Sequence, residues 1–363
     1  MTSETAGPGW RVGAVAIGRN EGERLRTCLM SLAPQSDRVV YVDSGSTDDS
    51  VAIAESIGVE VVHLDLSKPF TAARARNAGF RQLLSLEPQL THVQFIDGDC
   101  ELQPDWLAAA RSAFEAEPSD LAVVCGRRRE RFPERSVYNR MCDVEWDTPV
   151  GEATFCGGDS VMRADAFQAV GGFRDDFIAG EEPELCVRLR EAGWRIRRIG
   201  AEMTLHDAAI TEWGQWWKRV ERSGFAYAAG AWTHGQSDAR HNVREHRRIW
   251  FWGAALPTVA VAAAPVTLGT SLALFGAYPF SAMRAYRAVR RRGRTREDAG
   301  VFAALTLLGK APEVVGAARF HWQRTAGQTP QIIEYKGPAL DASRSGPKSE
   351  SEASGDSGEA KRS

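Results

Sequence analysis

The sequence contains few cysteines, and none of them has a spacing that suggests a pair. The six cysteines are scattered along 363 residues, without a Cys-x-x-Cys motif. Their pattern argues against a disulfide framework or a zinc site and is typical of a cytosolic protein with reduced thiols. The net charge of −2 provides no basic field, so we expect no nucleic-acid partner. No basic segment leading into an apolar run follows Met1, and we expect no signal peptide.

Strand-like and helix-like patterns alternate between residues 11 and 125. The strand-like runs are 12–17, 38–42, 59–64 and 91–96, and the helix-like stretches are 23–32, 48–57 and 71–86. This alternation is typical of βαβ units. It predicts an α/β fold, with a mostly parallel sheet that helices cover on both faces.

Three polar clusters follow the strand-like runs at their carboxyl ends, at residues 18–21, 43–49 and 97–99. In an open α/β sheet these strand ends meet at one edge, where ligands bind. The last cluster is Asp-Gly-Asp, and its two carboxylates are hard oxygen donors. Such donors suit Mg²⁺ or Mn²⁺ bound to a diphosphate. The alternative is a polar turn, because Asp-Gly is a common turn pair.

The order of motifs between residues 11 and 210 resembles that of a family 2 glycosyltransferase with the GT-A fold. The matching motifs are Asn20-Glu21, Asp43-Ser44-Gly45-Ser46-Thr47-Asp48, Ala75-Arg76-Asn77-Ala78-Gly79, Asp97-Gly98-Asp99, Gly157-Gly158-Asp159 with Arg163, and Gly180-Glu181-Glu182. The resemblance implies a Rossmann-like sheet flanked by helices. It also implies a nucleotide-sugar donor and a glycan or lipid-linked acceptor.

The resemblance assigns the donor pocket to residues of these motifs. Positions matching Glu21, Asp43 and Arg76 line the nucleotide pocket in the family. A carboxylate at Asp43 can accept the imide N–H of a base, and the planar fork of Arg76 suits a base or a diphosphate oxygen. Helix N-capping is the alternative for Asp43. The expected substrate-binding residues are Gly18, Glu21, Asp43, Ser44, Arg76, Asn77, Asp97, Gly158 and Asp159.

A metal site and a general base complete the implied machinery. Asp97 and Asp99 would hold Mg²⁺ or Mn²⁺, which helps the diphosphate to leave. His206, which ends a later strand-like run, is the candidate third ligand; a plain surface or core histidine is the alternative.

Glu181 and Glu182 precede Pro183, where we expect a helix over 183–192. An inverting transferase needs one base to deprotonate the acceptor hydroxyl. Family members usually have Asp at the position of Glu182. We therefore expect Glu182 to face the cleft as the base, with Glu181 as second candidate. The alternative is that both acids merely favour the helix N-terminus.

No charged residue occurs from Ile249 to Met283, and arginines flank this stretch on both sides. Positive residues at both ends predict that both ends stay cytoplasmic. The prolines within the stretch favour a hairpin of two short or re-entrant membrane helices. We therefore expect the protein at the cytoplasmic face of the inner membrane. The alternative is a buried helical pair in a soluble domain.

The chain divides into segments of distinct character. These are a flexible N-terminus (1–10), a GT-A catalytic domain (11–210), a helical connector (211–248), an apolar membrane hairpin or re-entrant segment (249–283), a basic or amphipathic helical region (284–340) and a disordered tail (341–363). The expected function is inverting, metal-dependent glycosyl transfer. A nucleotidyltransferase and a non-catalytic, membrane-bound sugar-binding or scaffold protein are the alternatives.

Overall fold

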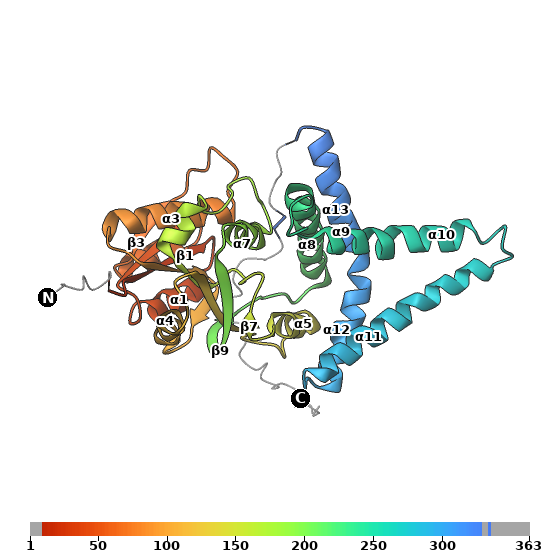
Figure 1. Ribbon diagram of the computed structural model, residues 1–363, viewed down its shortest axis with the longest axis horizontal. Coiled ribbons are helices and arrows are strands. Elements are labelled where there is room, and N and C mark those ends of the chain that lie inside the picture. Colours follow the sequence, from red (N-terminus) through yellow and green to blue (C-terminus); the bar gives the residue numbers. More distant parts are fainter. Residues whose placement is uncertain (1–8, 329–332, 335–363) are drawn as a thin grey trace, which may run out of the picture.

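The structure of the chain, a computed structural model, describes residues 9–328 and 333–334. The expected disordered tail (341–363) and most of the expected flexible N-terminus lie outside these residues. The described chain has two parts, which are a sheet covered by helices and a helical C-terminal half (Figure 1).

One mixed sheet forms the first part, with strand order β3-β2-β1-β4-β8-β6-β9-β5 and β7 paired to β9. The strands are β1 (Val12–Gly18), β2 (Arg38–Asp43), β3 (Glu60–His63), β4 (His92–Asp97), β5 (Cys100–Leu102), β6 (Leu121–Glu130), β7 (Gly151–Glu152), β8 (Ser160–Arg163) and β9 (Arg195–His206). From β3 to β4 every neighbouring pair is parallel. This half confirms the predicted βαβ units. Beyond β4 the sheet is mixed, because β8 runs antiparallel to both β4 and β6.

Helices fill the connections and form the C-terminal half. They are α1 (Glu23–Leu32), α2 (Ser50–Ser56), α3 (Ala72–Leu86), α4 (Trp106–Ala116), α5 (Val137–Trp146), α6 (Ala164–Ala169), α7 (Glu181–Glu191), α8 (Trp213–His234), α9 (Val243–Trp250), the π-helical turn η1 (Phe251–Ala255), α10 (Leu256–Ala262), the 3-10 turn η2 (Thr270–Gly276), α11 (Ala277–Arg291), α12 (Arg296–Leu308) and α13 (Lys310–Thr325).

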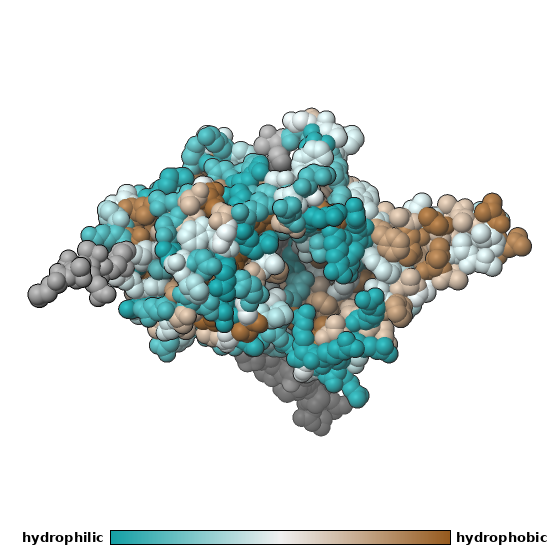
Figure 2. Space-filling model, in the orientation of Figure 1, coloured by the Kyte–Doolittle hydropathy of each residue, from teal (hydrophilic) through white to brown (hydrophobic). Residues whose placement is uncertain are grey.

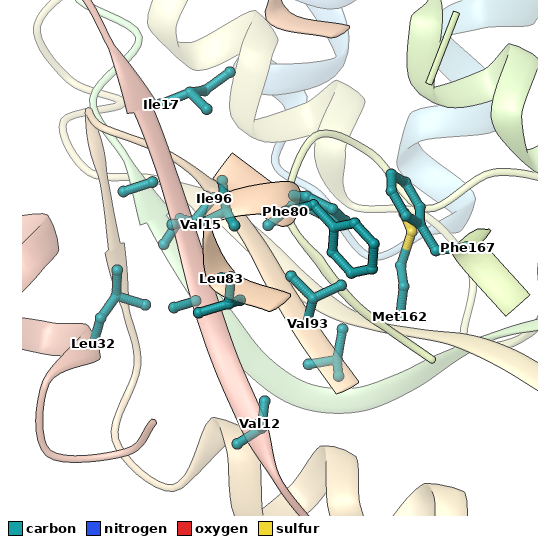
Figure 3. Packing of buried hydrophobic residues seen from close by; sticks show 14 of the residues in the cluster. Val12, Val15, Ile17, Leu32, Phe80, Leu83, Val93, Ile96, Met162 and Phe167 are labelled. Atoms are coloured by element: carbon teal, nitrogen blue, oxygen red, sulfur yellow. The ribbon is translucent and has the colours of Figure 1, made fainter. Parts of the chain in front are cut away.

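The main core lies between the sheet and the helices that cover it. Figure 3 shows Val15, Val93 and Ile96 of the central strands close to Phe80 and Leu83 of α3. Each such side chain stabilises the fold by about 1.5–3 kcal/mol when fully buried. The glycine of the Ala-Arg-Asn-x-Gly motif lets α3 lie close to the sheet. A Cβ on Gly79 would stand 2.3 Å from Val15 Cγ1.

The C-terminal half is built on α8, which packs along α13 and against α9. From this base α9, η1 and α10 lead outward, and η2 and α11 return to α12 (Figure 1). Residues 249–283 thus form a projecting pair of arms. Val266 and Leu268 at their tip are 84% and 94% exposed, which disfavours the alternative of a buried helical pair. That the segment enters a membrane stays a prediction.

A helix that spans a membrane needs about 20 consecutive, mostly apolar residues. Among the described residues no single helix has the necessary length and hydropathy, and one bent pair, α12 with α13 at 41°, meets both requirements together.

Candidate functional site

A cavity of about 560 Å³ opens at the carboxyl ends of β1, β2 and β4. This is the edge at which open α/β sheets bind their ligands. The predicted site residues that line it are Gly18, Glu21, Ser44, Arg76, Asp97, Asp99 and Glu181. Residues from all three strand-end clusters therefore meet in one cavity.

Arg76 joins two carboxylates at the floor of this cavity. Its Nη2 donates to Asp97 Oδ1 at 2.7 Å, and its Nη1 donates to Glu181 Oε1 at 2.8 Å. The side chain is 2% exposed. Burial lowers the pKa of Arg76, but the charges of Asp97 and Glu181 outweigh burial and raise that pKa above its ordinary value. The cavity therefore keeps a fixed positive charge between two acids.

Asp43 is buried and holds the loop that follows β2. Its carboxylate accepts hydrogen bonds from the backbone N–H groups of Gly45 and Ser46, at 3.0 and 3.1 Å, and from the hydroxyl of Tyr41 at 3.2 Å. These bonds bring Ser44 to the cavity wall. Asp43 itself does not line the cavity, so its contact with a base stays a prediction.

Asn77 has a different position from the one expected of a substrate-binding residue. Its Nδ2 donates to Phe173 O at 2.7 Å and to Asp175 Oδ1 at 2.8 Å, and its Oδ1 accepts from Phe173 N at 3.0 Å. One helical step from Arg76 turns the Asn77 side chain away from the cavity. The amide therefore fixes α3 to the loop before α7.

Asp99 and His206 meet beside the cavity, where β5 pairs with β9. His206 Nε2 lies 3.1 Å from Asp99 Oδ2, and the imidazole stacks on Trp146 with ring centroids 4.6 Å apart. Burial lowers the pKa of His206, and the charge of Arg128 lowers it further, so the neutral ring has a lone pair for a metal. Two carboxylates and an imidazole nitrogen form a donor set that Mn²⁺ or Mg²⁺ accepts. Asp99 and His206, with the thiol of Cys100, offer ligand atoms within 4.8 Å of one another. The chemistry of Asp99 and His206 fits such a cation, and the part of Asp97, whose Oδ1 accepts from Arg76, stays a prediction.

Gly158 and Asp159 stand behind Asp97. A Cβ on Gly158 would lie 3.1 Å from both Arg76 Nη2 and Asp97 Oδ2, so glycine allows these groups to gather. Asp159 is fully buried, and its Oδ2 pairs with Arg128 at 2.8 Å and accepts from Thr204 at 2.8 Å. Asp159 therefore supports the site from inside instead of lining the cavity.

The two acids of the Gly-Glu-Glu motif face different surroundings. The helix begins at Glu181, earlier than the expected start at Pro183, so both acids belong to its first turn. Glu181 lines the cavity. Glu182 Oε1 instead accepts from Cys156 N at 2.6 Å and from the thiols of Cys156 and Cys186 at 3.0 Å each. The expectation that Glu182 faces the cleft is therefore corrected. The physical reason is the rotation of about 100° between successive helix residues.

Comparison with known families agrees with this geometry. Residues 15–170 match the model of glycosyl transferase family 2, and residues 140–208 match the N-terminal domain of galactosyltransferase. Residues 15–170 thus belong to glycosyltransferase family 2. The matched segments include every predicted site residue. Membership of this family disfavours the nucleotidyltransferase alternative.

Two bacterial proteins are similar in sequence to this chain. The chain is 30% identical over 184 residues to the succinoglycan biosynthesis protein ExoA of Rhizobium meliloti, covering 48% of this chain and 54% of the relative. It is 28% identical over 218 residues to a pre-mycofactocin glycosyltransferase of Mycobacterium tuberculosis, covering 56% and 44%. The chain thus spans about half the length of these relatives.

A solved structure extends the likeness to most of the chain. The mannosyltransferase PcManGT from Pyrobaculum calidifontis, in complex with GDP-Man and Mn²⁺, superposes with a TM-score of 0.57 at 18% identity. The match covers 87% of this chain and 89% of the mannosyltransferase. This likeness confirms the predicted GT-A fold.

The cavity of the family 2 domain also includes residues that the motifs did not indicate. Arg222 reaches it from α8, beyond both matched segments, and Arg24 of α1 pairs with Glu21 at 2.8 Å. At the rim Arg19 pairs with Glu334, also at 2.8 Å. No motif or spacing in the sequence indicates that a residue of α8 reaches this edge of the sheet. The one sequence signal in residues 211–248 is their high content of arginine and tryptophan.

Proposed function

We propose that this chain transfers a sugar from a nucleoside diphosphate to an acceptor hydroxyl, with inversion at the anomeric carbon. The observation that supports this most is the meeting of Asp97, Asp99, Arg76 and Glu181 in one cavity at the carboxyl edge of the sheet. A diphosphate needs positive charge beside it, and a hydroxyl nucleophile needs a base. The cavity has a candidate residue for each requirement.

The metal of this proposal is Mg²⁺ or Mn²⁺, held by Asp97, Asp99 and His206. When bound, it would supply positive charge to the departing diphosphate. Arg76 is already held by Asp97 at the same place. It would orient the diphosphate through its planar fork.

The base of this proposal is Glu181. Its Oε1 accepts from Arg76 at 2.8 Å, which holds the carboxylate in place. The other oxygen, Oε2, would take the proton of the acceptor hydroxyl as the hydroxyl oxygen attacks the anomeric carbon. The bond from that carbon to the diphosphate oxygen breaks on the opposite face, which inverts the centre. Glu182, the residue first expected in this role, would position the start of α7 through its bonds to Cys156 and Cys186.

The acceptor of this proposal is a hydroxyl of a lipid-linked or growing glycan, at the cytoplasmic face of the inner membrane. The exposed apolar hairpin at 249–283 favours an acceptor near a lipid surface. The relative named for succinoglycan biosynthesis is in keeping with a glycan product.

Release of nucleoside diphosphate tests the proposal. The purified chain would be incubated with UDP-glucose and GDP-mannose, separately, with Mn²⁺ and a hydroxyl acceptor. We expect diphosphate release that Asp99→Asn and Glu181→Gln each reduce by about 10²–10⁴-fold. Glu191→Gln, at an exposed position of the same helix, should match the wild type. Full activity in Asp99→Asn and Glu181→Gln would contradict the proposed site.

Metal binding is measured separately from turnover. Mn²⁺ at 100 times its dissociation constant should raise the free energy of unfolding by about 2.7 kcal/mol. We expect that increase to be lost in Asp99→Asn and in His206→Ala. A scaffold that merely binds sugar would show neither diphosphate release nor this metal effect.

A further inference from the structure

The apolar segment 249–283 is the outer part of a longer hairpin, residues 243–292. This longer hairpin projects from the body and exposes apolar side chains at its far end. Figure 2 shows this end as a patch of hydrophobic residues that stands clear of the polar surface. The exposed side chains include Val259, Val261, Val266, Leu268 and Phe280, with exposed fractions of 54% to 94%. Such a projection is costly in water, and a patch of this kind marks an interaction site.

The outgoing arm changes its chemistry in a fixed order along its length. It begins with exposed arginines at Arg244, Arg247 and Arg248. The aromatic residues 250–252 come next, and residues 256–266 are almost wholly aliphatic. Charge, aromatic ring and aliphatic chain therefore follow one another from the body toward the tip.

The returning arm repeats this order in reverse. Apolar residues 272–275 come first, then Tyr278 and Phe280, and then exposed arginines at Arg284 and Arg287. The hydroxyl of Tyr278 donates to Trp252 O of the other arm, which aligns the two aromatic levels. The same layers thus occur at matching heights on both arms. They correspond to the phosphate, interfacial and acyl levels of a lipid leaflet.

Three hydroxyl groups at the tip donate hydrogen bonds within the hairpin. Thr267 Oγ1 donates to Ala263 O at 2.8 Å, and Ser271 Oγ donates to Ala260 O at 2.7 Å. Thr270 Oγ1 donates to Thr267 O at 2.9 Å. Hydroxyl groups bonded in this way need no water, which lowers the cost of placing the tip in a hydrocarbon medium.

Beyond Glu245, near its start, the hairpin carries charges of a single sign. No aspartate or glutamate occurs between Glu245 and Glu297. The exposed arginines 244, 247, 284 and 287 form no ion pair with another described residue. Arg294, by contrast, is tied to Asp143 and Asp147 and fixes the end of the hairpin to α5. The cationic zone is therefore available to an anionic surface.

We propose that this hairpin inserts its tip into one leaflet of a bilayer that contains anionic phospholipids, with its arginines at the lipid phosphates. At the helical rise of 1.5 Å per residue, the aliphatic residues 256–266 of the outgoing arm would span at most about 16 Å. The hydrocarbon of one leaflet is about 15 Å thick. The hairpin is a one-leaflet wedge that enters the membrane and turns back within it.

This inference goes beyond the proposed reaction, since it concerns where the chain binds. It also links that place to the cavity. Helix α8 carries Arg222 at the cavity wall and packs against α9, the first helix of the hairpin. A membrane contact would therefore fix the orientation of the cavity relative to the lipid surface.

Vesicle flotation of the full chain tests the inference without measuring turnover. Vesicles of phosphatidylcholine alone are compared with vesicles that also contain phosphatidylglycerol. We expect the wild type to float with the anionic vesicles and to lose this binding as salt is added. The double variant Val266→Asp, Leu268→Asn should bind on the order of 100-fold more weakly, because two apolar anchors are lost. Met30→Asp, at an exposed apolar position of α1, should bind like the wild type.

The charge requirement is tested by a second pair of variants. Arg284→Glu with Arg287→Glu should weaken binding to anionic vesicles by at least about tenfold and remove most of its salt dependence. Arg38→Glu, at an exposed position of β2, is the matched charge control. Thermal unfolding of each variant checks that the fold is kept.

Three outcomes would overturn the inference. The first is a wild type that floats with neither kind of vesicle. The second is a tip variant that binds as tightly as the wild type. In the third, the wild type self-associates without binding vesicles and the tip variant is monomeric, so that the hairpin is a contact between two copies of the chain.

Discussion

Glu181 and Glu182 are adjacent at the start of α7, yet Glu181 faces the cavity and Glu182 faces the interior. Glu181 Oε1 accepts from Arg76 at 2.8 Å. Glu182 Oε1 accepts from Cys156 N and from two thiols. Burial raises the pKa of both thiols, so they stay protonated and donate to the carboxylate. The two acids therefore have separable tasks.

Replacing each acid by glutamine should separate these tasks. Glu181→Gln keeps an oxygen for Arg76 but removes the base, so we expect diphosphate release to fall by about 10²–10⁴-fold. Glu182→Gln can still accept from Cys156 N. It should lower the free energy of unfolding by about 1 kcal/mol and leave turnover within about tenfold of the wild type. Steady-state kinetics and urea unfolding measure both effects. A reversed result would restore Glu182 to the role first expected of it.

Arg76 should matter for stability as well as for turnover. Arg76→Gln leaves the partly buried Asp97 and the buried Glu181 without their shared cation. Removing one partner of a buried ion pair costs about 3–5 kcal/mol of unfolding free energy. We expect a loss of this size in urea unfolding at neutral pH. The matched control is Arg111→Gln, which breaks an exposed pair with Glu115 and should cost no more than about 0.5 kcal/mol. Equal losses in the two variants would show that Arg76 is not the centre of a buried network.

The sequence predicted the parallel half of the sheet, in which strands and helices alternate along the chain. Strand and helix periodicity located β1 to β4, and their parallel arrangement brought the clusters at Glu21, Ser44 and Asp97 to one edge. The mixed half could not be ordered in the same way. Its order β8-β6-β9, in which β8 is antiparallel to β6 and β6 is parallel to β9, follows from no local pattern.

Site residues could be predicted where the end of a strand places them at the edge of the sheet. They could not be predicted where the turn of a helix decides which of two neighbouring side chains faces the cavity. A motif places Asn77 next to Arg76, but helix geometry turns one to the cavity and the other to Phe173. The same limit applies to Glu181 and Glu182. Arg222 could not be predicted for another reason. It lies at the cavity because α8, which is distant in the sequence from the strand ends, packs beside them.

Gly79 should be intolerant of even one added methyl group. Its motif position is explained by packing, since a Cβ there would stand 2.3 Å from Val15 Cγ1 and 2.8 Å from Val42 Cγ2. Alanine gains up to about 1 kcal/mol of helix propensity, but overpacking of a rigid core costs more. We expect Gly79→Ala to lower the free energy of unfolding by a net 1–3 kcal/mol, about the usual cost of overpacking. Gly214→Ala is the control, because a Cβ on this residue of α8 meets no atom within 4 Å. That variant should be neutral or slightly stabilised, and a similar loss in both would contradict the packing argument.

His92 should make the fold less stable in mild acid. It begins β4, with its ring 4.1 Å from that of Trp10 and 4.6 Å from that of Phe114. Burial, aided by the charge of Arg163, lowers the pKa of His92 to about 4. Below the ordinary histidine pKa of about 6.5, the unfolded chain gains a proton that the folded chain does not take up. Its contribution to stability is therefore complete above pH 6.5 and declines as the pH falls toward 4.

The size of this effect follows from the same shift. At pH 5 the wild type should lose about 2 kcal/mol of unfolding free energy through His92 relative to pH 7.5. His92→Phe keeps an aromatic ring between Trp10 and Phe114 and removes the proton site, so its loss between these pH values should be smaller by that amount. Urea unfolding at both pH values measures the difference, and His63→Gln, at an exposed position of β3, controls for the loss of a histidine as such. Equal pH dependence in wild type and His92→Phe would mean that His92 is protonated in the folded chain at pH 5, and that its burial against Trp10 and Phe114 does not keep it neutral.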